Sequence, residues 1–204
     1  EKNNLFKSPE TYMEKISTKA KEKNVVDLDN SVRKNIFNLC EYLNKKPENL
    51  TACILDRPRH KEIIKELIRL DVKIKLITDG DVSGALLVTD DKYNVDIFLG
   101  TGGGPEGVLA ATAIDTFECS FQGRFLFVSD VDKKRAKEMG IEDFNKKYEI
   151  NEIVSGDSIF CATGITQNEL VNGVKLIDGK FITETLVTQK NSIPYIEKKE
   201  VPIT

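Results

Sequence analysis

From residue 50 to residue 140, short apolar segments alternate with segments whose apolar residues recur at helical spacing. The strand-type segments are LTACILD (50–56), KIKLIT (73–78), NVDIFLG (94–100) and GRFLFV (123–128). A helix-type segment follows each of them, at 60–70, 79–88, 102–117 and 131–140. This alternation is typical of βαβ units. We therefore expect an α/β fold with a mainly parallel sheet and helices on both of its faces.

Two helices are expected before this alternation begins. Ser8, Pro9 and Glu10 have the order of an N-cap, a first helical residue and a first-turn acid, which predicts a helix over about residues 8–16. Helical spacing of apolar residues predicts a second helix over 30–43, capped by Asp29. The chain is accordingly divided into a helical lead-in and junction at 1–46 and an α/β domain at 47–204.

The C-terminal part has a different pattern. Residues 157–165 and 173–188 are of strand type, and Asp178-Gly179 has the composition of a hairpin turn. We therefore expect an antiparallel hairpin after the parallel units. The last residues, 198–204, are expected to fray.

Charge and composition exclude several classes of protein. Lys and Arg number 30 against 33 Asp and Glu, so the net charge is -3, and the basic excess of a nucleic-acid-binding protein is missing. No apolar run reaches the roughly 18 residues that cross a membrane. The four cysteines are far apart without CxxC pairs, which favours buried, reduced thiols and a cytoplasmic protein.

Charged residues follow three successive strands of the expected sheet. Arg57, Pro58 and Arg59 follow the first, the segment 79–81 (Asp-Gly-Asp) the second, and the glycine-rich segment 100–107 the third. Ligands of open α/β sheets bind at the carboxyl ends of the strands, so these groups should converge there. Two arginines held by a proline suit a phosphate group, although solvated arginines are common at strand ends. Asp81 could equally serve as a helix cap.

The glycine-rich segment GTGGGPEG matches neither of the common phosphate-binding motifs. Pro105 stands where the third glycine of GxGxxG belongs, and the P-loop lysine and hydroxyl are missing. Pro105 instead predicts a helix start, with Glu106 in the first turn. Glu106 then either stabilises the helix or ligates Mg²⁺ or Mn²⁺. The single histidine, His60, is interpreted as a helix-start residue rather than a base.

Several separated motifs together resemble the class II fructose-1,6-bisphosphatases, a branch of the metal-dependent, inositol-monophosphatase-like sugar phosphatases. They are PETYMEKI, DRPRH, ITDGDVSGALL, GTGGGPEGVLAA and CATGIT with TETLV, in the order of that family. The resemblance implies a cytoplasmic enzyme of gluconeogenesis that removes the 1-phosphate of fructose 1,6-bisphosphate with Mn²⁺ or Mg²⁺. In some members it also implies action on sedoheptulose 1,7-bisphosphate. It makes residues 47–204 a sugar-phosphate-binding domain.

The resemblance also assigns residues and partners. Glu106 becomes a metal ligand, and the residues that contact substrate become Tyr12, Arg57, Pro58, Arg59, Asp79, Gly80, Asp81 and Gly103. The family's N-terminal segment carries most metal ligands and the groups that activate water, and this chain shows no match to it. We therefore expect the C-terminal portion of such an enzyme, inactive alone, with its catalytic residues unassigned and the N-terminal portion as its partner. A homo-oligomer is expected as well.

Two alternatives remain open at this point. A non-catalytic sugar-phosphate-binding module or sensor would need the same binding residues. A haloacid-dehalogenase-like phosphatase is suggested by Asp79 and Asp81 after an apolar strand, but Ser83 stands where that motif has Thr or Val.

Overall fold

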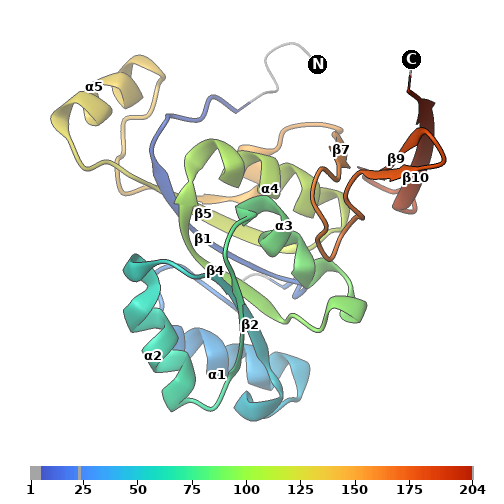
Figure 1. Ribbon diagram of the computed structural model, residues 1–204. Coiled ribbons are helices and arrows are strands. Elements are labelled where there is room, and N and C mark those ends of the chain that lie inside the picture. Colours follow the sequence, from blue (N-terminus) through green and yellow to red (C-terminus); the bar gives the residue numbers. More distant parts are fainter. Residues whose placement is uncertain (1–5, 23, 204) are drawn as a thin grey trace.

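The computed structural model describes residues 6–22 and 24–203, and its centre is a six-stranded sheet, which we call sheet A. The strand order is β3-β2-β4-β1-β5-β6 (Figure 1). The strands are β1 (Tyr12–Thr18), β2 (Thr51–Leu55), β3 (Lys73–Ile77), β4 (Ile97–Gly103), β5 (Ser120–Leu126) and β6 (Lys147–Glu149). The pairs β2–β3 and β2–β4 are parallel, and β5 runs in the same direction as β4 because both are antiparallel to β1. The α/β prediction is confirmed, and four of the six strands share one direction.

The first predicted helix is wrong, because residues 12–18 form β1 in the middle of the sheet. Every residue of β1 pairs with β4 on one side and with β5 on the other. Met13 faces one apolar core and Ile16 the other. A local cap signal such as Ser8-Pro9 contributes only about 1 kcal/mol. Completing two ladders and burying both faces of a central strand outweighs that signal.

Helices cover both faces of sheet A, as expected. On one face α1 (Val32–Leu43) and α2 (Lys61–Arg69) pack against Ala52, Ile97 and neighbouring residues. On the other face α3 (Asp81–Leu86) and α4 (Gly104–Thr116) cover Cys53 and Phe98. Figure 1 shows the two pairs on opposite sides of the strands. The N-cap of α1 is Ser31, whose hydroxyl accepts from the Lys34 N–H, so the predicted cap at Asp29 is wrong.

A second, antiparallel sheet lies beside α4, and we call it sheet B. It contains β7 (Ile159–Thr163), β8 (Lys175–Ile177), β9 (Lys180–Gln189) and β10 (Tyr195–Pro202). Asp178 and Gly179 have φ values of 49° and 71°, which confirms the predicted hairpin turn between β8 and β9. The expectation of a frayed end is wrong for residues 198–202, which belong to β10 and pair with β9; residue 204 lies outside the described residues.

The remaining elements are short. They are α5 (Asp130–Glu138), α6 (Ile150–Ile153) and 3-10 helices at Pro47–Asn49, Pro58–His60, Leu87–Thr89 and Asp91–Tyr93. Three cysteines are buried, but Cys161 is exposed on β7, contrary to expectation. Within the described residues, no helix has the length and apolar character to cross a membrane. The division of the chain at residue 46 stays a prediction.

Candidate functional site

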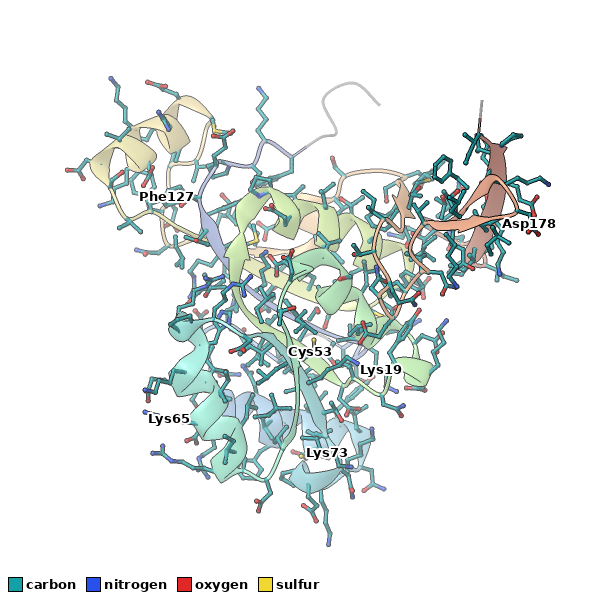
Figure 2. All side chains as sticks on the ribbon, in the orientation of Figure 1. Lys19, Cys53, Lys65, Lys73, Phe127 and Asp178 are labelled. Atoms are coloured by element: carbon teal, nitrogen blue, oxygen red, sulfur yellow. The ribbon has the colours of Figure 1, made fainter. Side chains whose placement is uncertain are left out.

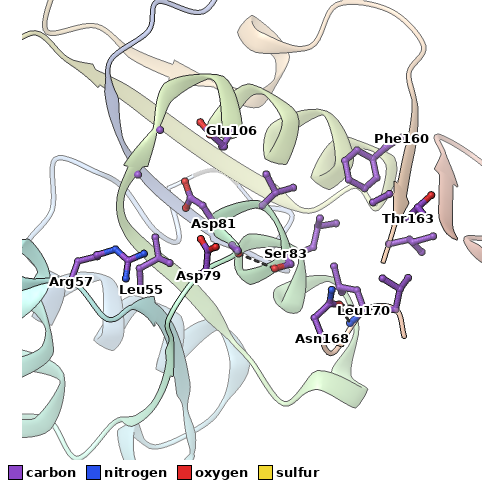
Figure 3. Close-up of a pocket in the computed structure, with 18 of the residues that line it drawn as sticks. Leu55, Arg57, Asp79, Asp81, Ser83, Glu106, Phe160, Thr163, Asn168 and Leu170 are labelled. Atoms are coloured by element: carbon purple, nitrogen blue, oxygen red, sulfur yellow. Dashed lines mark hydrogen bonds between the residues drawn. The ribbon is translucent and has the colours of Figure 1, made fainter. Parts of the chain in front are cut away.

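A cavity of about 530 Å³ lies at the carboxyl ends of β2, β3 and β4. It brings together the predicted site residues Tyr12, Arg57, Arg59, Asp79, Gly80, Asp81, Gly103 and Glu106. Pro58 is exposed in the same turn as the arginines and is not among the residues that line the cavity. Figure 3 shows Asp79 and Asp81 between Arg57 on one side and Phe160 and Thr163 on the other. We call the strand-end residues the near wall, and β7 with residues 164–172 the far wall.

The near wall contains two arginines whose charges are not neutralised by an ion pair among the described residues. The Arg59 Nε donates to the Thr101 carbonyl at 2.9 Å, and its guanidinium lies 5.0 Å from the centre of the Tyr12 ring. Arg57 donates to the Asp56 carbonyl at 2.9 Å. These contacts use carbonyls and a ring face, so both guanidiniums keep donors available for an anion.

The His60 side chain joins two segments of the near wall through hydrogen bonds. Its Nδ1 donates to the Leu55 carbonyl at 2.7 Å, and its Nε2 accepts from the Thr101 N–H at 2.8 Å. Burial lowers the pKa of the imidazole, so the neutral tautomer that this geometry requires is favoured. Gly100 has a φ of 146°, and a Cβ there would lie 3.0 Å from Nε2. Both ring nitrogens are used, which supports the helix-start interpretation over a base.

Asp81 forms a buried ion pair that the sequence did not reveal. Its Oδ2 accepts from the Lys15 Nζ, and only 1% of the Lys15 side chain is exposed. Burial lowers the pKa of Lys15, while the carboxylates of Asp81 and Glu106 act in the opposite direction. The Asp81 Oδ1 is buried and has no hydrogen-bond partner among the described residues. Gly80, not Asp81, is the N-cap of α3, so the capping interpretation of Asp81 is wrong.

Two glycines make room for the carboxylates of the near wall. A Cβ at Gly102 would overlap the Asp81 carboxylate, and a Cβ at Gly103 would overlap the Glu106 carboxylate. Glu106 is exposed in the first turn of α4 and lines the cavity. The glycine-rich segment therefore packs against carboxylates, and the positive charge beneath it comes from Lys15.

The far wall was not predicted. Phe160, Ala162 and Thr163 line the cavity from β7, and Asn168, Leu170 and Val171 line it from the following loop. Glu184 anchors this loop, since its Oε2 accepts from the backbone N–H and the Nδ2 of Asn172 at 2.9 and 2.8 Å. These hydrogen bonds and Lys198 lower the pKa of Glu184 to about 2. The only sequence signal was the CATGIT motif, which assigned no residue to the cavity.

Comparisons with known proteins identify the family. A family model described as bacterial fructose-1,6-bisphosphatase, glpX-encoded, matches residues 1–199. The chain belongs to this family. A Synechococcus sp. (strain JA-3-3Ab) protein named D-fructose 1,6-bisphosphatase class 2/sedoheptulose 1,7-bisphosphatase is 35% identical over 205 residues. Relatives of the same name come from Trichodesmium erythraeum, at 35% identity, and from Synechocystis sp., at 33%.

These matches cover most of this chain but only part of the relatives. The alignment covers 94% of this chain and 59% of the Synechococcus protein, and 99% and 64% for the Synechocystis protein. The chain thus spans about three fifths of the length of the class 2 bisphosphatases it matches. The resemblance inferred from the motifs is confirmed at the level of the family.

The metal expected for this bisphosphatase family can be tested against the described residues. Across 6–22 and 24–203, no three His, Cys, Asp or Glu side chains are grouped so that they could hold a metal ion. Glu106, with its carboxylate in the space left by Gly103, fits the position of one oxygen ligand. Hard divalent cations need about six oxygens, so the residues fit part of such a site.

Proposed function

We propose that this chain supplies the sugar-phosphate-binding half of a class II fructose-1,6-bisphosphatase. The enzyme would hydrolyse the 1-phosphate of fructose 1,6-bisphosphate in gluconeogenesis, in the cytoplasm, and would also accept sedoheptulose 1,7-bisphosphate. The family match supports this proposal, as do the names of the relatives. One cavity carries the proposal: it combines two arginines that have no ion-pair partner with an Asp81 oxygen that has no hydrogen-bond partner, both within the part of the chain that the structure describes.

The near wall can recognise both parts of a sugar phosphate. Arg57 and Arg59 would bind the phosphate that is not cleaved through charge-assisted hydrogen bonds. The Asp81 Oδ1 would accept a hydrogen bond from a sugar hydroxyl, which would satisfy its buried lone pairs. Asp79 is exposed at the same edge and would accept from a second hydroxyl. Lys15 would keep the Asp81 carboxylate fixed during binding.

Glu106 is the residue that would hold Mn²⁺ or Mg²⁺ from this chain. A bound divalent cation supplies Lewis-acid stabilisation of the charge on the reacting phosphate. Further ligands and the catalytic residues would come from the N-terminal portion of the enzyme, in line with the length of the relatives. The 204-residue chain alone should therefore bind substrate without turning it over, and we expect the complete enzyme to be a homo-oligomer.

The experiment measures fructose 1,6-bisphosphate binding by calorimetry and phosphate release with Mn²⁺ on one preparation of the chain. Binding without release is expected. Rapid release by the chain alone would contradict the half-enzyme proposal, and failure to bind the bisphosphate would contradict the assignment of the cavity. If the assembled enzyme, with the N-terminal portion added, binds but still releases no phosphate, the non-catalytic module is the better description.

A further inference from the structure

The two faces of sheet B have different environments. The inner face packs on the body of the molecule, where Leu186 is buried and the Thr188 hydroxyl accepts from the Thr116 hydroxyl at 2.8 Å. Most side chains of the outer face are exposed, and Tyr195 at its edge also borders a cavity that Tyr93 and Phe117 of the body line. Figure 2 shows the hairpin around Asp178 at the margin of the molecule, with its side chains projecting outward.

Strand register gives the composition of the outer face, because directly paired residues point to the same side. One apolar row is Cys161, Val187 and Tyr195, and another is Leu176, Phe181 and Val201. Between them lie polar rows that contain Glu197 and Lys199. Leu176 is 60% exposed, Tyr195 56%, Val201 43% and Phe181 42%. Two exposed apolar rows on one face are typical of an interaction surface, whereas single exposed apolar side chains are common on any protein.

We propose that the outer face of sheet B docks the part of a class 2 bisphosphatase that this chain does not match. This inference rests on the proposed function. About two fifths of the length of the Synechococcus relative lies outside the alignment, and a chain of that length must pack on the matched part or extend away from it. The outer face of sheet B offers two exposed apolar rows for such a contact.

The position of this face relative to the cavity supports the same occupant. Thr163 lines the cavity and pairs with Thr185, which pairs with Glu197 in a row of the outer face. A polypeptide that covers the outer face therefore reaches the rim of the cavity. The apolar rows are about 20 Å apart along the strands at ~3.3 Å per residue. A helix of about 13 residues that lies along the strands would contact both rows. Such an occupant is positioned to complete the site from its open side.

A second copy of this chain could cover the outer face instead of the unmatched portion of the enzyme. The accessibility of one thiol on this face can distinguish these two partners. Cys161 lies in an outer-face row and is exposed, whereas Cys40, Cys53 and Cys119 are buried. Burial also raises the pKa of Cys53 to about 12 and that of Cys119 to about 11, so both are poor nucleophiles. A maleimide should therefore label Cys161 selectively.

The experiment measures the rate at which a maleimide labels Cys161 in three samples. The first is the chain alone, the second is the chain mixed with the unmatched portion of the Synechococcus relative, and the third is a fusion of the two polypeptides. We expect labelling in the fused chain to slow at least tenfold. Slowing that depends only on the concentration of the chain itself would assign the face to a second copy. A fused chain that melts cooperatively but labels at the rate of the chain alone would show that the face is not the docking surface.

Matched variants separate docking from general effects. Leu176→Glu places a charge in the outer face, and Ile68→Glu makes the same kind of change on α2, where Ile68 is 61% exposed. Leu176→Glu should restore fast labelling of the fused chain, and Ile68→Glu should not. Equal behaviour of the two variants would contradict the proposal. Labelling reports docking and phosphate release reports activity, so a fused chain that is protected but inactive refutes the proposed function and not the docking surface.

Discussion

The near wall and the far wall of the cavity depend on different supports. The near wall stands at the strand ends of sheet A. Buried polar contacts there join Lys15 of β1 to Asp81 of α3, and join His60 to β2 and β4. The far wall belongs to sheet B, and its loop is held by Glu184, by the Asn168 side chain and by the Lys75–Glu169 ion pair. The comparison indicates that the near wall supplies fixed charges, while the far wall supplies a boundary that can be altered with less effect on the fold.

The largest expected effect comes from removing the buried positive charge of Lys15, which pairs with Asp81 of the near wall. Lys15→Met would leave Asp81 without its cation, and breaking a buried pair costs about 3–5 kcal/mol. Urea unfolding should show a loss of that size. Lys19→Met is the matched control, because its partner Asp91 is 84% exposed and the loss should stay below about 1 kcal/mol. Equal losses in the two variants would mean that Lys15 contributes no more than a surface pair.

Replacing the charges that face the ligand should affect binding more than folding. Arg57→Ala together with Arg59→Ala should weaken fructose 1,6-bisphosphate binding by roughly 2–4 kcal/mol, since each charged hydrogen bond contributes ~1.5–3 kcal/mol with partial overlap. Calorimetry with the bisphosphate and with a monophosphate that lacks the distal group measures the effect. The monophosphate should lose much less affinity. An equal loss for both ligands would contradict a role for the arginines in binding the distal phosphate.

The sequence predicted the near wall far better than the strand that supports it. Arg57, Asp79 and Glu106 follow consecutive strands, and parallel topology alone brings such positions to one edge. Lys15 was missed because residues 12–18 form a strand only through pairing with β4 and β5, which are distant in sequence. A local cap signal cannot report such pairing.

The far wall was missed for a chemical reason. Phe160, Ala162 and Thr163 carry no charge and no metal-binding group, so nothing distinguishes them from an ordinary half-buried strand. Likewise β10 is exposed along its length, and only its ladder with β9 defines it as a strand. Uncharged residues that line a cavity are therefore harder to predict from the sequence than the charged residues of the same cavity.

Acid should loosen the far wall through protonation of Glu184. The folded pKa of Glu184 is about 2, below the 4.5 of an ordinary Glu, so its stabilising effect is complete above about pH 4.5 and is lost as the pH falls toward 2. Hydrogen exchange of the Asn172 amide, which donates to Glu184, should lose protection across this window. Glu184→Gln should remove that pH dependence. The control is the Lys73 amide of sheet A, which donates to the Leu50 carbonyl at 3.0 Å and so has a partner that does not titrate. If it lost protection over the same range, the change would be general unfolding and not a response of the far wall.

The smallest effect is expected from a methyl group added beside the exposed Glu106 carboxylate. Gly103 has φ −63° and ψ 141°, which alanine also adopts, so Gly103→Ala strains no backbone. Its Cβ would meet only the end of the exposed Glu106 side chain, which can rotate away, so stability should change by no more than about 0.5 kcal/mol. Gly102→Ala is the matched control, because its Cβ would meet the Asp81 carboxylate that Lys15 holds in place. That overlap cannot relax freely and should cost about 1–3 kcal/mol. Urea unfolding of the two variants gives the comparison. If both lost the same stability, Asp81 would be no more fixed than Glu106, and the buried ion pair would not set the geometry of the near wall.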